Sequence, residues 1–202
     1  HIFRFYDKNG VFLNKFEYIN DNFFTKVTLP KIKSTNKYIS FTHESQELNK
    51  NSFIFKNLRK KNVIGIQHRG YTVYKKTSYS LGNIAHGNFG GITFTDKISS
   101  SAVQRNNEFK YTTMYLFKKT EFYDLVFNNP TAKELKIKIL LENYKREISQ
   151  MTELILKPYG TNFYEVRNYN GKISFISKLP VCRCLVFKNP EILNKNFDVF
   201  HA

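Results

Sequence analysis

The segment TAKELKIKILLENYKREISQMTELILK, residues 131–157, has the most regular apolar pattern in the chain. Thr131 and Glu134 have the spacing of a capping box, and Pro130 stands just before the cap. Apolar residues then recur close to the helical period, at Ile137, Leu140, Leu141, Tyr144, Ile148, Met151, Leu154 and Ile155. The segment predicts one long amphipathic helix, although its first part, residues 133–141, also alternates as a strand does.

Strand and turn signals surround this segment. Apolar residues alternate on both sides of Asn9-Gly10, which is typical of a β-hairpin, and residues 163–167 and 172–176 flank a second such pair, Asn170-Gly171. Further strand candidates are residues 23–29, 38–42, 53–55, 63–67, 109–117, 122–127 and 181–187. Together these signals predict an α+β fold, with the helix packed on a mostly antiparallel sheet with hairpins.

The length and composition indicate one folded domain, residues 1–202. The 202 residues are 41% hydrophobic and 16% aromatic, enough for a single core and unlike a disordered chain. Glycine gathers at about residues 65–91, which predicts a glycine-rich loop region there. Asn189-Pro190 opens a short C-terminal tail, expected from about residue 189.

The charge balance is the most informative property of the composition. Lys and Arg number 32 against 16 Asp and Glu, so the formal net charge is +16. A surplus of this size repels itself in a compact protein, and its usual partner is a polyanion such as RNA, DNA or an anionic lipid surface. An AT-biased genome is the alternative explanation for the many lysines, but it does not explain the shortage of acids.

Basic stretches lie along the whole chain and are interleaved with Tyr and Phe. Lysine and arginine contact phosphates, while aromatic rings stack on unpaired bases, so the pattern predicts contact with RNA on several sides of the protein. The expected nucleic-acid-binding residues are Lys31, Lys33, Arg59, Lys60, Lys61, His68, Arg69, Lys75, Lys76, His86, Lys118, Lys119, Lys145 and Arg146.

The glycine-rich region at residues 65–91 is the first candidate for a phosphate contact, because glycine lets the backbone approach a ligand closely. It contains neither a P-loop nor a dinucleotide-binding motif, and a surface loop with tight turns explains its glycines as well. A nucleic-acid-processing enzyme remains an alternative. It would use carboxylates that meet in space, with Lys172 nearby, namely Asp96, Glu121, Asp124 and Glu165.

Metal, cofactor and membrane signals are absent from the sequence. The only cysteines, Cys182 and Cys184, are too few for a zinc site, so we expect neither a metal nor another cofactor. No run is long and apolar enough for a transmembrane segment. The few cysteines favour a reducing intracellular compartment. The start at His1 fits removal of an organelle-targeting segment, which favours the mitochondrial matrix.

The sequence therefore favours a non-catalytic structural subunit of a large assembly. This subunit would contact RNA and neighbouring proteins, and the leading candidate for the assembly is an organellar or divergent ribosome. The first alternative is a peripheral subunit of a mitochondrial membrane complex, held to an anionic membrane surface. The second alternative is the nucleic-acid-processing enzyme.

Overall fold

A computed structural model describes residues 2–19, 26–44, 71–75, 83–86, 103–105, 108–129, 133–145, 147–178, 184–192 and 196–202. Side chains are described for the same residues except 42–44, 71, 83–86 and 103–105. These residues form antiparallel strands joined by turns, and they contain no helix. The expected α+β fold is therefore wrong, and the described part of the chain is all-β.

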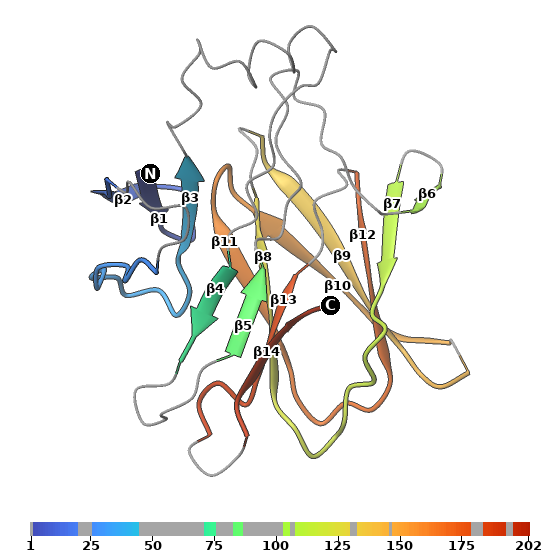
Figure 1. Cartoon of the computed structure of the whole chain (residues 1–202). Helices are drawn as coiled ribbons and strands as arrows, with labels where there is room; N and C mark the ends of the chain where they lie inside the picture. The colour runs from blue at the N-terminus through green and yellow to red at the C-terminus, as the bar shows by residue number, and fades with distance from the viewer. Residues whose placement is uncertain are drawn as a thin grey trace, which may run out of the picture.

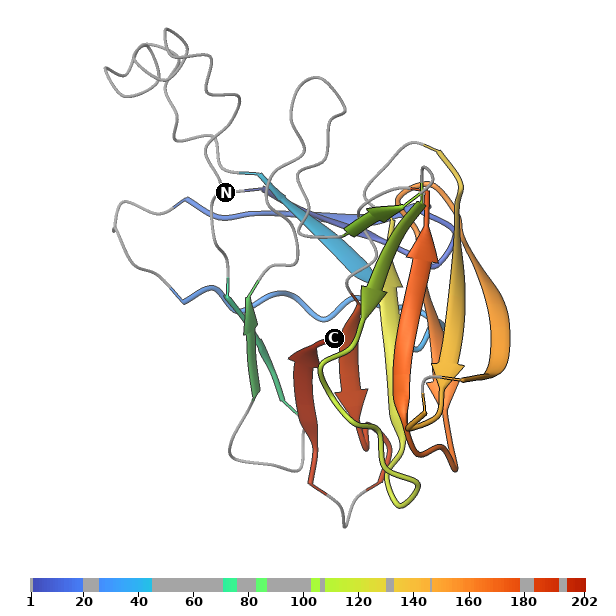
Figure 2. The same ribbon diagram turned by 90° about the vertical axis from the view of Figure 1, so that its right-hand side faces the viewer.

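Two antiparallel sheets lie face to face (Figures 1 and 2). The five-stranded sheet has the order β10 (Ile148–Leu156), β9 (Leu135–Glu142), β12 (Lys172–Ser177), β7 (Glu108–Thr112) and β6 (Val103–Arg105). The four-stranded sheet has the order β11 (Thr161–Val166), β8 (Tyr123–Asn128), β13 (Leu185–Lys188) and β14 (Asp198–His201). The two sheets form a β-sandwich.

The main core fills the space between the two sheets. Leu125 and Phe127 of β8 pack there with Ile137 and Ile139 of β9, and all four side chains are buried. Successive side chains of a strand point to opposite faces, so the lysines that alternate with these residues on β9 point away from the core. Each large apolar side chain buried in this way contributes about 1.5–3 kcal/mol of stabilisation.

The four-stranded sheet is covered on its outer face as well, so β8 is buried on both sides. The cover includes the hairpin of β4 (Tyr71–Tyr74) and β5 (Asn83–His86), which lies beside β14 (Figure 2). Tyr38 and Tyr74 both pack on Phe187 of β13, with ring centroids 5.0 and 5.2 Å away. This second, smaller core contains Val126, Leu185 and Val199.

The N-terminal strands make a third sheet with the order β2 (Phe12–Glu17), β1 (Ile2–Tyr6) and β3 (Ser40–Glu44). The predicted hairpin at Asn9-Gly10 is confirmed, since β1 and β2 pair across it. Gly10 has a φ of 76° and lies so close to the carbonyl of Pro158 that a Cβ would collide with it. Glycine is therefore needed at the point where this hairpin meets the β10–β11 turn.

The segment expected to be a long helix, residues 131–157, instead contains the hairpin of β9 and β10. Its apolar residues fit both the period of a helix and the alternation of a strand. Only the alternation agrees with which side chains are buried in the structure. Ile139, which falls outside the helical stripe, is buried, whereas Met151 and Ile148 of the stripe are exposed. Facing strands across the sandwich bury the alternating residues of β9, and this tertiary packing overrides the local helical pattern.

The second predicted hairpin is wrong, although its strands exist. β11 and β12 flank the turn at residues 167–171, but β11 pairs with β8 and β12 pairs with β7 and β9, in the opposite sheet. The turn therefore connects the two layers of the sandwich. In the part of the chain that the structure describes, no helix has the length and hydropathy to cross a membrane.

Candidate nucleic-acid interface

Three connections leave the sandwich in the lower half of Figure 1: residues 113–122 and 167–171 at the bottom, and residues 143–145 in the turn that projects to the right. Gly171 joins them, because its backbone exchanges hydrogen bonds of 2.9 and 3.2 Å with that of Phe117. On its other side Gly171 touches the carbonyl of Glu142, at the end of β9. The Tyr169 hydroxyl, whose pKa burial raises to about 12, is shared between the carbonyl oxygens of Glu142 and Lys172, each 2.6 Å away. We call these three connections the loop end.

The loop end has a local excess of positive charge. Lys118, Lys119 and Lys145 are exposed there, and Lys172 is half-buried. Within the described residues none of these four lysines forms an ion pair. The nearby acids Glu121 and Glu142 each pair with another lysine, Lys188 at 3.4 Å and Lys110 at 2.9 Å, and Glu147 accepts a hydrogen bond from the Asn143 amide at 2.8 Å. The four lysine charges are therefore free to meet an anionic partner.

The β9–β10 turn presents an aromatic ring next to one of these lysines, Lys145. Tyr144 is 65% exposed and stands between Asn143 and Lys145. The side-chain oxygen of Asn143 accepts hydrogen bonds from the backbone N–H groups of Lys145 and Glu147, at 2.9 and 3.0 Å. Its amide donates to the Glu147 carboxylate at 2.8 Å. These bonds support the described backbone of the turn, and the Tyr144 ring is left in solvent.

The β7–β8 connection of the loop end also exposes two apolar side chains. Met114 is 97% exposed and Leu116 is 44% exposed. The aromatic residues that alternate with them, Tyr115 and Phe117, pack in the core. The aromatic rings therefore hold this connection on the core, while the aliphatic side chains between them point into solvent.

The other basic residues expected to bind RNA are placed elsewhere or lie outside the described residues. Lys31 and Lys33 are exposed between β2 and β3, and Lys75 is exposed just after β4. The loop end thus collects only part of the predicted set, namely Lys118, Lys119 and Lys145. Outside the described side chains lie Arg59, Lys60, Lys61, His68, Arg69, Lys76, His86 and Arg146. Most of the glycine-rich region, residues 65–91, also lies outside, and its described parts are β4, β5 and Lys75.

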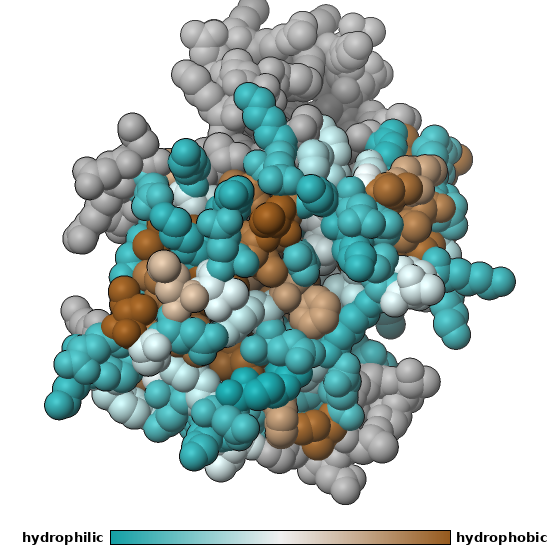
Figure 3. Space-filling model, turned by 180° about the vertical axis from the view of Figure 1, so that it is seen from behind, coloured by the Kyte–Doolittle hydropathy of each residue, from teal (hydrophilic) through white to brown (hydrophobic). Residues whose placement is uncertain are grey.

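The outer face of the five-stranded sheet has balanced charges. Lys136 pairs with Glu153 at 3.2 Å, and Lys138 pairs with Glu108 at 3.4 Å. Figure 3 shows the molecule from behind, where hydrophobic residues form separate small patches among hydrophilic ones. These lysines already have acidic neighbours, so this face attracts a polyanion less than the loop end does.

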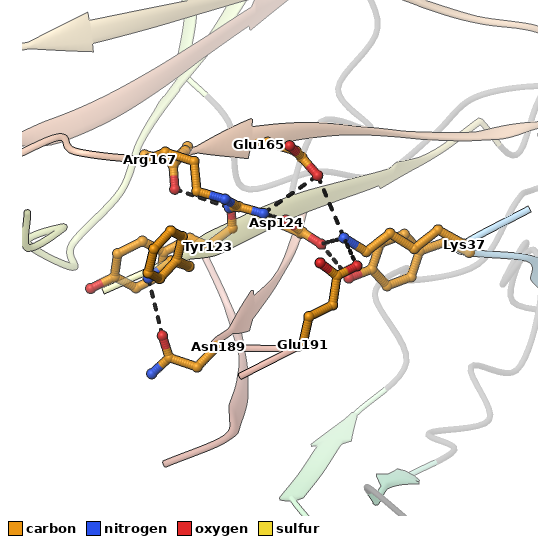
Figure 4. A network of polar contacts seen from close by, with 10 residues as sticks. Lys37, Tyr123, Asp124, Glu165, Arg167, Asn189 and Glu191 are labelled. Carbon is orange, nitrogen blue, oxygen red and sulfur yellow. Dashed lines mark hydrogen bonds and ion pairs between the residues drawn. The ribbon is translucent and has the colours of Figure 1, made fainter. Parts of the chain in front are cut away.

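A buried ion network lies on the outer face of the four-stranded sheet (Figure 4). The Asp124 side chain is 0% exposed, and its oxygens accept from Tyr38 at 2.7 Å, from Lys37 at 2.8 Å and from Arg167 at 2.9 Å. Lys37 also contacts Glu191 at 2.6 Å. The network therefore joins the N-terminal segment and the β13–β14 connection to the sandwich.

The environment shifts the pKa of two groups in this network. Burial raises the pKa of Tyr38, and the hydrogen bond to the charged Asp124 raises it further. Burial lowers the pKa of Lys37, but its bonds with Asp124 and Glu191 outweigh burial, and the net pKa is raised. Both groups thus hold their protons more firmly than usual.

The carboxylates expected for an enzyme do not form one open site in the described residues. Asp124 and Glu165 do come together as cross-strand neighbours, but Glu121 pairs with Lys188 and Lys172 lies in the opposite sheet. Asp96 lies outside the described residues. A general base needs an oxygen within reach of the substrate, whereas the donors above occupy both oxygens of the buried Asp124. Among the described residues, no three His, Cys, Asp or Glu side chains are placed to hold a metal ion.

Sequence reasoning missed Tyr144, Met114 and Leu116. Tyr144 was assigned to the buried stripe of the expected helix. The polar run around it, Asn143 to Glu147, was the available signal, since Asn in such a run favours a turn. No protein-family model, curated protein or solved structure matches this chain.

Proposed function

We propose that the protein is a non-catalytic structural subunit that contacts RNA in a large ribonucleoprotein assembly, such as an organellar or divergent ribosome. The observation that carries the proposal is the loop end, where Lys118, Lys119, Lys145 and Lys172 have no acidic partner among the described residues. Phosphate groups are the natural partners of such lysines, and the net charge of +16 favours a polyanion in general.

The distribution of ion pairs supports the loop end over other surfaces. Lys136 and Lys138 on the five-stranded sheet are neutralised within the chain, whereas Lys118 and Lys119 are not. Exposed lysines elsewhere, such as Lys31, Lys33 and Lys75, also have no ion pair among the described residues. The loop end differs from these sites because four such lysines stand on segments that Gly171 links.

The exposed apolar side chains support the subunit part of the proposal. Met114 and Leu116 project at the loop end, while Met151 and Ile155 project from β10 at the edge of the five-stranded sheet. A subunit inside an assembly can cover such side chains with neighbouring proteins. We therefore expect protein partners as well as RNA.

The test compares two double variants that remove the same charge. Lys118→Ala with Lys119→Ala should weaken RNA binding and lower the slope of log affinity against log salt by about 1.4 for a single strand. Lys136→Ala with Lys138→Ala should leave affinity nearly unchanged, because those lysines already pair with Glu153 and Glu108. Equal losses in both variants, or binding that ignores salt, would refute the proposal.

A second candidate is docking to an anionic membrane surface, as a peripheral subunit of a mitochondrial membrane complex. The specific observation is Met114, 97% exposed, on the same connection as Leu116 and the pair Lys118-Lys119. Apolar side chains that insert into a bilayer beside lysines that meet anionic headgroups would use both features. Flotation with phosphatidylserine vesicles in the absence of RNA, lost in Met114→Ser, would favour this candidate.

A further inference from the structure

The Tyr144 ring has no packing role that explains an aromatic residue at its position. The side chain is 65% exposed at the tip of the β9–β10 turn, and it belongs to neither hydrophobic core of the described residues. The bonds of Asn143 hold the backbone of this turn. The turn therefore keeps a large aromatic ring in water, next to the exposed Lys145.

The other lysines of the loop end stand on connections that Gly171 links to the start of this turn. Gly171 lies between Phe117 and Glu142, bonding to the backbone of the first and touching the carbonyl of the second. Lys118 directly follows Phe117, and the turn that carries Tyr144 directly follows Glu142. β12 separates β7 from β9, and neighbouring strands are about 4.8 Å apart, so Phe117 and Glu142 are separated by about two strand spacings, or about 10 Å, where the two connections leave the sandwich.

We propose that the loop end binds single-stranded RNA, with an unpaired base stacked on Tyr144, the neighbouring phosphate held by Lys145, and phosphates further along the strand held by Lys118 and Lys119. This inference rests on the proposed RNA contact and specifies the form of the RNA. Base stacking on an aromatic ring combined with lysine contacts to the backbone is how proteins bind single strands.

A duplex fits this arrangement less well. Bases in an A-form helix are stacked on one another and are not available to a side chain, so Tyr144 has no partner there. The lysines can contact the phosphates of either form. The ring should therefore add affinity for the single strand only.

The experiment measures fluorescence anisotropy of the full chain with a labelled oligouridine of about 12 nucleotides and with a duplex of the same length. Tyr144→Ala should weaken single-strand binding about tenfold and leave duplex binding unchanged. Tyr144→Phe should retain the affinity, because the ring stacks without its hydroxyl. Tyr159→Ala is the matched control, since Tyr159 is also exposed but lies in the β10–β11 turn at the opposite end of β10.

The outcomes separate this inference from the proposed function. If Tyr144→Ala changes neither affinity while the Lys118/Lys119 variant weakens both, the RNA contact stands and the stacking is wrong. Equal losses for both RNA forms would also overturn the stacking. If the wild-type protein binds neither RNA but floats with anionic vesicles, the proposed function itself is wrong.

A second measurement needs no variant. Photocrosslinking of the wild-type protein to oligouridine carrying 5-iodouridine should attach the RNA to Tyr144, because the stacked base lies against the ring. Cross-links found only at residues outside the loop end would overturn the inference.

Discussion

The hydroxyl of Tyr38 donates a hydrogen bond of 2.7 Å to the carboxylate of Asp124, 86 residues later in the chain. The Tyr38 ring packs on Phe163 and Phe187 at the same place. Lys37 adds an ion pair to Asp124 at 2.8 Å. Two adjacent residues thus attach the N-terminal segment to the outer face of the four-stranded sheet through one buried carboxylate.

Removing the Tyr38 hydroxyl should destabilise the protein. Tyr38→Phe keeps the ring packing but deletes a hydrogen bond to a charged group, so the free energy of unfolding should fall by about 1.5–3 kcal/mol. Urea denaturation measures this. Tyr159→Phe is the control, because no hydrogen bond of that hydroxyl lies within the described residues. Equal stability of Tyr38→Phe and the wild type would contradict the role of this bond.

Stability should fall in alkaline solution. The pKa of Tyr38 is raised from 10.0 in the folded state, so the folded protein binds this proton more tightly than the unfolded chain. The resulting stabilisation is complete below the ordinary pKa of 10.0 and is lost as the pH rises toward the folded-state pKa. Lys37, raised from 10.5, acts in the same direction.

Urea denaturation at several pH values checks this expectation. The free energy of unfolding should stay level up to about pH 10 and decline above it. Tyr38→Phe should reduce the decline without abolishing it, because Tyr123 and Tyr169 also have raised pKa values. The linkage would be wrong if the wild type and Tyr38→Phe declined with the same slope.

Substitutions in residues 131–157 distinguish the hairpin from the helix. Ile139 is buried in the sandwich but lies outside the helical stripe, whereas Met151 lies in the stripe but is 66% exposed. Ile139→Ala should therefore cost about 2–5 kcal/mol and Met151→Ala less than about 0.5 kcal/mol. Thermal unfolding measures both, and the reverse order would favour the helix.

Gly171→Ala should disturb the loop end. Gly171 has a φ of 155°, and a Cβ there would meet the carbonyl of Glu142 and the hydroxyl of Tyr169. We expect a loss of more than about 1 kcal/mol in the free energy of unfolding. A Gly171→Ala protein that melts like the wild type would show that this contact is not tight.

The error at residues 131–157 has a definite physical origin. Leu140, Leu141, Ile148 and Met151 recur with a helical period, and the same segment also alternates from Leu135 to Leu141. A helix and a hairpin both satisfy the backbone hydrogen bonds of this segment. Which of them forms therefore depends on which set of apolar side chains finds partners in the rest of the protein. Those partners, such as Leu125 and Phe127, belong to another strand, β8. The order of residues within 131–157 therefore does not reveal them.

The sequence by itself determined what depends on neighbouring residues and on composition. It specified the excess of positive charge, and it specified the hairpin at Asn9-Gly10, where glycine permits a backbone conformation that other residues rarely adopt. It also specified five strands of the sandwich, β7, β8, β11, β12 and β13, but not β6, β9, β10 or β14. Only the tertiary structure decided that Lys118 and Lys145 share one end of the sandwich, and that Lys37 and Arg167 enclose Asp124. Contacts between distant residues follow from how strands pair and sheets pack, and no period of apolar residues within one segment encodes that arrangement.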